Sequence, residues 1–159
     1  MDEKNVKQLT WEQTEEMVDH LVEKLGGQSF NIILCINRGG LVVGSLLSDK
    51  LALPLGVIAT QSYKYGHKHQ MGEQAFNPVI AATDKVQGDV LIVDELVDTG
   101  KTMLKLVDHF SKLSGVTSLT TACLVKKPHA EYSPDYFVEE VDAWVVFPFQ
   151  KKEFENLLH

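Results

Sequence analysis

Two adjacent carboxylates and the polar turn that follows them make residues 90–102 the chemically most informative part of this sequence. Four apolar residues at 90–93 predict a buried strand that ends at Asp94 and Glu95. The turn at 97–102 then supplies a glycine, two hydroxyls and a lysine before a helical pattern begins. Such a turn presents free backbone N–H groups and a positive dipole end to an anion. Together these residues predict a site for a phosphorylated ribose.

Two common nucleotide-binding motifs are excluded by neighbouring residues. A Walker A loop requires a glycine five positions before Gly100, and Glu95 occupies that position. The glycine-rich turn at 38–44 lacks the dinucleotide-binding fingerprint, because Leu41 stands where the second glycine belongs. The sequence therefore favours neither a nucleoside triphosphatase nor a nicotinamide enzyme.

The composition is that of a globular protein, and its 159 residues predict one domain spanning 1–159. Cys35 and Cys123 lie in apolar runs, which indicates buried thiols in a reducing compartment. No apolar run approaches the roughly 20 residues of a membrane span, and no secretory signal is recognised, so we expect a cytoplasmic location. The net charge of −7, without a dense basic stripe, argues against nucleic-acid binding.

Predicted helices and strands alternate along the chain, which indicates an α/β fold with a mostly parallel sheet covered on both faces. Thr10 and Gln13 predict a capping box for the first helix, whose apolar face would contain Trp11, Val18, Leu21, Val22 and Leu25. The other expected helices are 40–51, 100–113 and 151–158, and the expected strands are 31–36, 55–60, 88–93, 118–125, 136–138 and 143–147. Arg38, Asp94 and Lys127 each follow a strand, so they can converge at one edge of the sheet.

The segment 90–102 resembles the signature of type I phosphoribosyltransferases: a hydrophobic run, two acidic residues, two variable residues, then acid-Thr-Gly-x-Thr. The turn at 37–40 is similar to the family's pyrophosphate-binding turn. Lys127-Pro128 and the residues 138–144 resemble the base-binding end of the 6-oxopurine branch, especially its short xanthine-guanine-type members. The resemblance covers roughly residues 30–150. It implies a three-layer, Rossmann-like twisted sheet with a small hood built from about residues 126–159.

The resemblance also implies how the substrate's phosphoribosyl part is held. In the family the acidic pair binds the ribose hydroxyls, partly through a magnesium ion, so Mg2+ is the expected cofactor at Asp94 and Glu95. The implied phosphoribosyl-binding residues are Asp94, Glu95, Val97, Asp98, Thr99, Gly100, Lys101 and Thr102. Helix capping or a solvated strand end is the alternative interpretation of the carboxylates and hydroxyls.

Two further groups would act on either side of the ribose. Asp98 is the implied catalytic residue near purine N7, where an ionised carboxylate suits proton acceptance, although it could instead cap the helix. Arg38, Gly39 and Gly40 would bind pyrophosphate, in a turn that often contains a non-proline cis peptide in the family. Without segment 90–102, Arg38 would be interpreted as a surface residue of a strand–helix turn.

The base would be bound by Lys127, Trp144 and Val145. Lys127 is expected to hydrogen-bond the 6-oxo group, although the adjacent Lys126 leaves the register open. Trp144 would stack on the purine and the Val145 backbone would meet its edge, whereas periodicity alone would place this indole in the core. Ser62 and Tyr63 resemble the start of the family's mobile loop, about 61–77.

The implied function is a purine salvage enzyme that transfers phosphoribosyl from phosphoribosyl pyrophosphate to N9 of guanine, xanthine or hypoxanthine and releases pyrophosphate. Its partners would be these substrates and a second copy of the chain, as a homodimer or homotetramer. One alternative is a regulator or sensor that binds phosphoribosyl pyrophosphate without catalysis. A phosphoribosyltransferase for another base and a plain sugar-phosphate-binding module also remain open.

Overall fold

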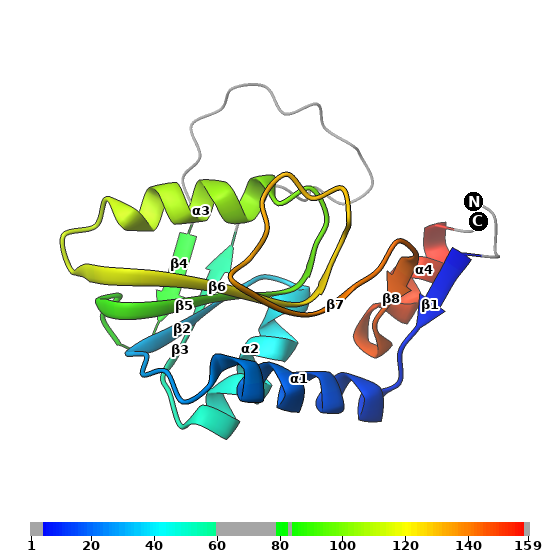
Figure 1. Cartoon of the computed structure of the whole chain (residues 1–159), viewed down its shortest axis with the longest axis horizontal. Helices are drawn as coiled ribbons and strands as arrows, with labels where there is room; N and C mark the ends of the chain where they lie inside the picture. The colour runs from blue at the N-terminus through cyan, green and yellow to red at the C-terminus, as the bar shows by residue number, and fades with distance from the viewer. Residues whose placement is uncertain (1–4, 60–78, 83, 158–159) are drawn as a thin grey trace.

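A six-stranded sheet forms the centre of the molecule in the computed structural model, which describes residues 5–59, 79–82 and 84–157 (Figure 1). The strand order is β4-β3-β2-β5-β6-β7, and of these described strands β4 alone runs antiparallel to its neighbour. The strands are β2 (Ile32–Ile36), β3 (Leu55–Ala59), β4 (Val79–Ala82), β5 (Gly88–Val97), β6 (Val116–Lys126) and β7 (Tyr136–Glu140).

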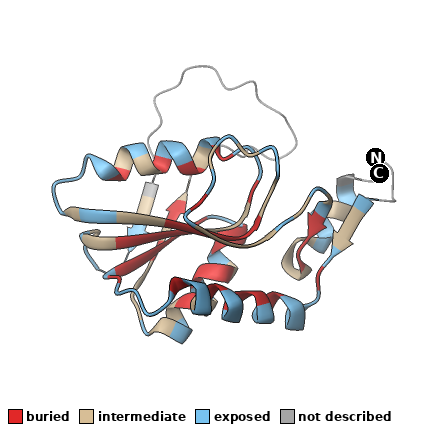
Figure 2. Cartoon of the chain, viewed as in Figure 1, coloured by how far each residue is buried: buried red, intermediate tan, exposed pale blue. Residues whose placement is uncertain are grey.

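Helices cover both faces of this sheet and make a three-layer α/β fold. On one face, α1 (Trp11–Leu25) and α2 (Gly39–Leu51) pack against buried residues such as Leu91. On the other face, α3 (Lys101–Ser111) packs against a second buried set that includes Ile92. Figure 2 shows the buried residues along the centre of the sheet and on the helix sides that face it. The predicted fold class is therefore confirmed.

The ends of α1 agree with the sequence expectation, but one member of its apolar face does not. Thr10 and Gln13 form both hydrogen bonds of the capping box, and Gly26 ends the helix at φ 61°. Trp11, however, is 51% exposed. As the first residue of the helix, Trp11 instead contacts Phe149, with the ring centroids 5.9 Å apart.

Strand β5 is longer than the sequence pattern predicted. The apolar run ends at Val93, but the strand continues to Val97 because β6 still pairs with it as far as Val97 and Lys126. The acidic pair therefore lies inside a strand and not after its end. The short strand β4 was also not predicted, since four residues carry too little periodicity.

A second, smaller sheet contains the two parallel strands β1 (Val6–Gln8) and β8 (Trp144–Val146). The 3-10 helix η2 (Pro148–Gln150) and α4 (Lys151–Leu157) follow β8. Figure 1 shows this unit beyond one end of the large sheet. The sequence did not predict β1, which at three residues gives almost no local signal.

Cys35 and Cys123 are buried free thiols, as expected, and burial raises the pKa of Cys35 to about 11. Among the described helices, none combines the length and apolar character needed to cross a bilayer.

Candidate active site

The turn that follows β2 lies directly against the acidic pair of β5. A Cβ atom on Gly39 would stand 2.1 Å from Cδ of Glu95, and one on Gly40 would stand 3.0 Å from Oδ1 of Asp94. A side chain at Gly39 would displace the Glu95 carboxyl group, and one at Gly40 would crowd Asp94, so glycine at both positions permits this approach. The structure thereby brings the predicted pyrophosphate-binding turn and the predicted ribose-binding carboxylates together.

The same turn contains a cis peptide bond between Asn37 and Arg38. Arg38 precedes the first residue of α2, and its guanidinium donates a hydrogen bond to Oε2 of Glu153 at 2.9 Å. Both side chains are about half exposed. The predicted pyrophosphate-binding arginine thus contacts a carboxylate of α4.

The position of Asp94 and Glu95 within β5 leaves them open on one side. β2 pairs with β5 only as far as Cys35 and Val93, so beyond this point the β2 side of β5 faces the glycine turn. Burial, reinforced by the neighbouring Glu95, raises the pKa of Asp94 well above its usual range. Within the described residues, Asp94 and Glu95 take part in no salt bridge.

Glu95 has a neutral partner from the C-terminal segment. The Gln150 side-chain amide donates to Oε1 of Glu95 at 2.8 Å. Gln150 belongs to η2, fifty-five positions further along the chain, so η2 also lies at the edge of this site. The sequence analysis missed this contact.

These two carboxylates suit a magnesium ion. Magnesium prefers oxygen ligands and is usually bound by one or two carboxylates together with substrate phosphates. No cluster of three or more metal-ligating side chains occurs in the described ranges. The donor set therefore fits an ion that would also need oxygens of a bound substrate.

The turn between β5 and α3 is shaped by Gly100. This residue has φ 81° and precedes the first residue of α3, without a side-chain cap. A Cβ there would lie 2.6 Å from the carbonyl oxygen of Tyr132, so the loop after β6 packs onto the turn. Thr99 Oγ1 accepts from the Lys101 N–H at 3.4 Å, and Thr102 is half-buried in the first turn of α3.

Asp98 has a partner that the sequence analysis did not identify. Its Oδ1 lies 2.7 Å from Nε2 of His129, in the loop after β6. The capping alternative for Asp98 is wrong, because Gly100 occupies the N-cap position. A histidine two residues after Lys127 carries no recognisable signal, and only the folded loop shows what it contacts.

The two adjacent lysines at the end of β6 have different surroundings. Lys126 is 13% exposed and pairs with Glu140 at 2.6 Å. The Lys127 ammonium instead donates to the backbone carbonyl of Ala143. Burial lowers the pKa of Lys127, although the nearby Asp98 acts in the opposite direction.

Trp144 is 44% exposed on β8, so the core position that periodicity alone would indicate is wrong. Val145 is buried beside it and pairs with Lys7 of β1. Lys127 contacts the residue immediately before Trp144. The predicted loop residues Ser62 and Tyr63, within 61–77, lie outside the described residues.

Comparisons with known proteins give one consistent result. A family model described as phosphoribosyl transferase domain matches residues 5–153. The xanthine-guanine phosphoribosyltransferase of Idiomarina loihiensis is 30% identical over 145 residues, which cover 89% of this chain and 84% of that protein. The crystal structure of a purine phosphoribosyltransferase from Pyrococcus horikoshii is 34% identical, with a TM-score of 0.75 and 91% and 93% of the two chains covered. A Helicobacter pylori xanthine-guanine-hypoxanthine phosphoribosyltransferase shares the fold at 21% identity and TM-score 0.74, covering 97% and 99%.

Proposed function

The chain belongs to the phosphoribosyltransferase family, and from this premise we propose that it is a 6-oxopurine phosphoribosyltransferase. The reaction would join N9 of guanine, xanthine or hypoxanthine to C1′ of phosphoribosyl pyrophosphate and release pyrophosphate. Relatives named for purine substrates support this choice. The half-exposed Trp144 next to the Lys127 contact also supports it, because a flat base needs a ring to stack on.

One observation carries the proposal: the glycine turn packs so closely onto the acidic pair that a side chain on Gly39 would overlap the Glu95 carboxyl group. Arg38, Gly39 and Gly40 would bind the pyrophosphate group, and Asp94 and Glu95 would bind the ribose hydroxyls beside it. A substrate that carries both groups on neighbouring atoms fits this arrangement.

The 5′-phosphate would be held on the other side of the ribose, by the turn before α3. Backbone N–H groups at the beginning of that helix and the hydroxyls of Thr99 and Thr102 are suitable donors. Val97, Gly100 and Lys101 would shape this turn or contribute their backbone. Binding energy from this phosphate, which does not react, would fix C1′ for attack.

Asp94 and Glu95 would also hold Mg2+, which, when bound, neutralises the charge that develops on the leaving pyrophosphate. The raised pKa of Asp94 agrees with this role, since a bound cation would stabilise the charge of a partly buried carboxylate. Glu95 is oriented for such binding by the amide of Gln150.

On the base side, Lys127 would donate to the 6-oxo group, Trp144 would stack on the ring and the Val145 backbone would contact its edge. Lys126 is engaged with Glu140 and is the less suitable lysine. Asp98 would accept the N7 proton as N9 bonds to C1′. No covalent intermediate with the protein is needed.

The decisive experiment mixes the protein with Mg2+, phosphoribosyl pyrophosphate and one base at a time, and measures pyrophosphate release. We expect turnover with at least one of guanine, xanthine and hypoxanthine, and none with uracil. Turnover with adenine or uracil alone would refute the purine assignment. Saturable binding of phosphoribosyl pyrophosphate without turnover of any base would instead establish the sensor alternative.

A further inference from the structure

We propose that His129 is a positioning residue for Asp98, so that the group that handles the purine proton is a carboxylate–imidazole pair. This inference rests on the proposed function and adds a residue to it. The carrying observation is the 2.7 Å contact between His129 Nε2 and Asp98 Oδ1, two side chains that are 31 positions apart in the sequence.

The backbone holds this contact in place from both sides. The Lys127 N–H donates to the carbonyl of Val97 at 2.9 Å, and the Glu131 N–H donates to the carbonyl of Thr99 at 2.9 Å. These bonds bracket Asp98 on one loop and His129 on the other. The two side chains therefore face each other because their loops are paired.

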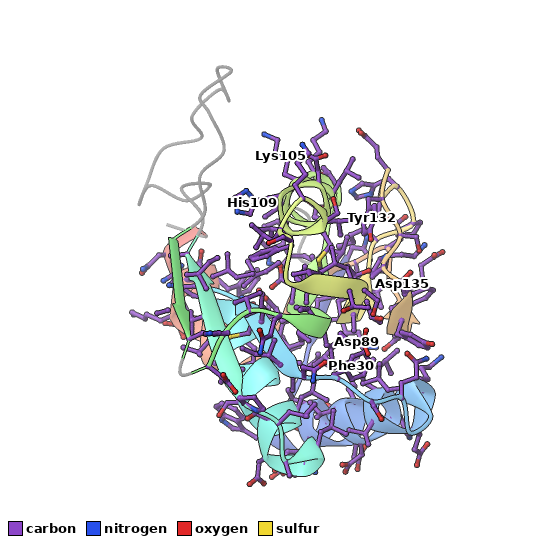
Figure 3. The ribbon with its side chains drawn as sticks, turned by 90° about the vertical axis from the view of Figure 1, so that its left-hand side faces the viewer. Phe30, Asp89, Lys105, His109, Tyr132 and Asp135 are labelled. Atoms are coloured by element: carbon purple, nitrogen blue, oxygen red, sulfur yellow. The ribbon has the colours of Figure 1, made fainter. Side chains whose placement is uncertain are left out.

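The loop that carries His129 is itself anchored to the sheet. The Thr121 side chain on β6 is 1% exposed and donates to Asp135 Oδ2 at 2.9 Å. The Asp135 N–H returns a hydrogen bond to Thr121 Oγ1, and the Tyr132 hydroxyl lies 3.0 Å from the same oxygen. Figure 3 labels Tyr132 and Asp135 in this segment, next to the large sheet. The packing of Tyr132 on Gly100 completes the attachment.

Both members of the pair remain accessible to a ligand. The side chains of His129 and Asp98 are 58% and 65% exposed, respectively. If Nε2–H of His129 donates to Oδ1, the other carboxylate oxygen is left to accept a proton from a base. The imidazole thus holds the carboxylate in one orientation and leaves its reactive oxygen open.

In the proposed transfer reaction, the pair would remove a proton from the purine. A purine with its proton on N7 uses the N9 lone pair to form the bond to C1′, while the C1′–O bond breaks and its electrons leave with pyrophosphate. The purine would then be cationic unless N7 loses its proton, and Asp98 accepts that proton. A neutral His129 that donates one hydrogen bond leaves Asp98 basic, whereas a doubly protonated His129 makes it a weaker base.

Charged groups from both loops and from α3 lie near the pair. Lys127 is close enough for its pKa to be influenced by Asp98 and by Asp142. Lys101, the first residue of α3, pairs with Glu131 at 3.7 Å, and Glu131 lies two residues after His129. A second proton on the imidazole would weaken Asp98 as a base, so the proposal predicts slower turnover at the acidic end of the pH profile.

The test compares kcat from pH 6 to 8 in the wild type, His129→Ala and His129→Gln, at saturating substrates. We expect kcat of His129→Ala to be about tenfold lower at pH 8, the usual effect of losing one hydrogen bond to a charged group. Glutamine can donate in the same place but cannot gain a proton, so His129→Gln should recover most of the loss and show no decline toward pH 6. His20→Gln, on the exposed side of α1, is the matched control and should follow the wild type.

Two outcomes would overturn the proposal: wild-type kcat in His129→Ala, or a wild-type pH profile in His129→Gln. An active wild type with either result would refute the role of His129 and leave the proposed function intact. No turnover by the wild type with any purine would refute both.

A second measurement does not need turnover. Long-range 1H–15N correlation spectra at pH 8 report which ring nitrogen of a histidine carries the proton, and Asp98→Ala identifies the affected signal. We expect the proton of His129 on Nε2 in the wild type and a redistribution in Asp98→Ala. A His129 protonated on Nδ1 alone would contradict the proposal, because Nε2 could not then donate to the carboxylate.

Discussion

At the scale of single residues, the adjacent Lys126 and Lys127 have different contacts because their side chains point in different directions. Lys126 lies on the last position of β6 and reaches Glu140, with its ammonium 5.0 Å from the centre of the Phe137 ring. Lys127 is the first residue beyond the strand and reaches the segment before Trp144. The sequence left the register of the two lysines open, and the structure gives each a distinct environment.

Replacing each lysine by methionine separates a binding role from a structural one. Lys127→Met should lower kcat/KM for the purine about tenfold or more, because the proposed charged donor to the 6-oxo group would be lost. Lys126→Met should keep kcat/KM within about twofold, since a partly exposed ion pair contributes little. Steady-state kinetics at fixed phosphoribosyl pyrophosphate measures both. A larger kinetic loss in Lys126→Met would assign the base contact to Lys126.

Sequence reasoning at this scale succeeded where a motif names the residue and failed where only a distant contact does. Asp94 and Glu95 were selected by type and spacing and Gly39 by the family resemblance, and the three residues lie together. His129 and Gln150 carry no local signal, because their partners are 31 and 55 positions away. Such contacts become visible only after the loops have been placed.

At the scale of elements, the candidate site depends on how closely α2 begins against β5. The first residue of α2 is Gly39, and its missing side chain leaves the space that the Glu95 carboxyl group occupies. The helix can therefore begin at the sheet edge without moving the acidic pair. The sequence predicted a helix at 40–51, close to the observed Gly39–Leu51. It could not show which residues the first turn of this helix contacts.

Gly39→Ala tests this dependence. The added methyl group would displace the Glu95 carboxyl group, which is the end of a flexible side chain. We therefore expect kcat/KM to fall at least tenfold while the free energy of unfolding changes by about 1 kcal/mol or less. Gly115→Ala, in the turn before β6 and away from the site, is the control and should leave kcat/KM unchanged. Wild-type kinetics in Gly39→Ala would show that Glu95 can move without consequence.

A second element-scale feature is the contact between α4 and the glycine turn. The Glu153 carboxylate pairs with the Arg38 guanidinium. In the proposed complex the pyrophosphate group of the substrate would compete for the same guanidinium. Glu153→Gln removes this competing charge, and we expect KM for phosphoribosyl pyrophosphate to fall about twofold to fivefold, the range for an exposed ion pair. Glu155→Gln on the same helix, which affects only the Lys152 pair, should leave KM unchanged. An increase of KM in Glu153→Gln would mean that the pair instead orients Arg38 for binding.

At the scale of the whole molecule, the fold follows from patterns that the sequence displays over long stretches. Continuous apolar runs predicted β2, β5 and β6, and their alternation with helices predicted the parallel sheet. Strand lengths were less predictable, since β5 extends through two carboxylates because its neighbour β6 is long. Short pieces such as β1 and β4 depend entirely on their partners.

The partly buried Asp94 should reduce the stability of the whole molecule at neutral pH. Because its pKa is raised in the folded state, the folded protein binds a proton that the unfolded chain has already released. Stability is therefore lost as pH rises from about 4 through the raised pKa. Asp94→Asn removes this cost and should raise Tm by about 2–4 °C at pH 8, while abolishing turnover.

Thermal unfolding of wild type and Asp94→Asn at several pH values, without metal or substrate, measures this effect. The difference in Tm should be small near pH 4 and should grow toward pH 8. A difference that is constant with pH, or a less stable variant at pH 8, would contradict a partly buried, poorly stabilised carboxylate.

If Trp144 binds the base as proposed, the pairing of β1 with β8 has a practical consequence for redesigning base specificity. Val6 lies opposite Trp144 and Lys7 opposite Val145, so the position of the indole depends on a strand from the other end of the sequence. A combinatorial library restricted to the neighbourhood of Trp144 would vary β8 and leave β1, the strand that β8 pairs with, unchanged. Randomising positions 6–8 together with 144–146 would allow the ring to tilt or shift, and so reach ligand shapes that single replacements cannot accommodate.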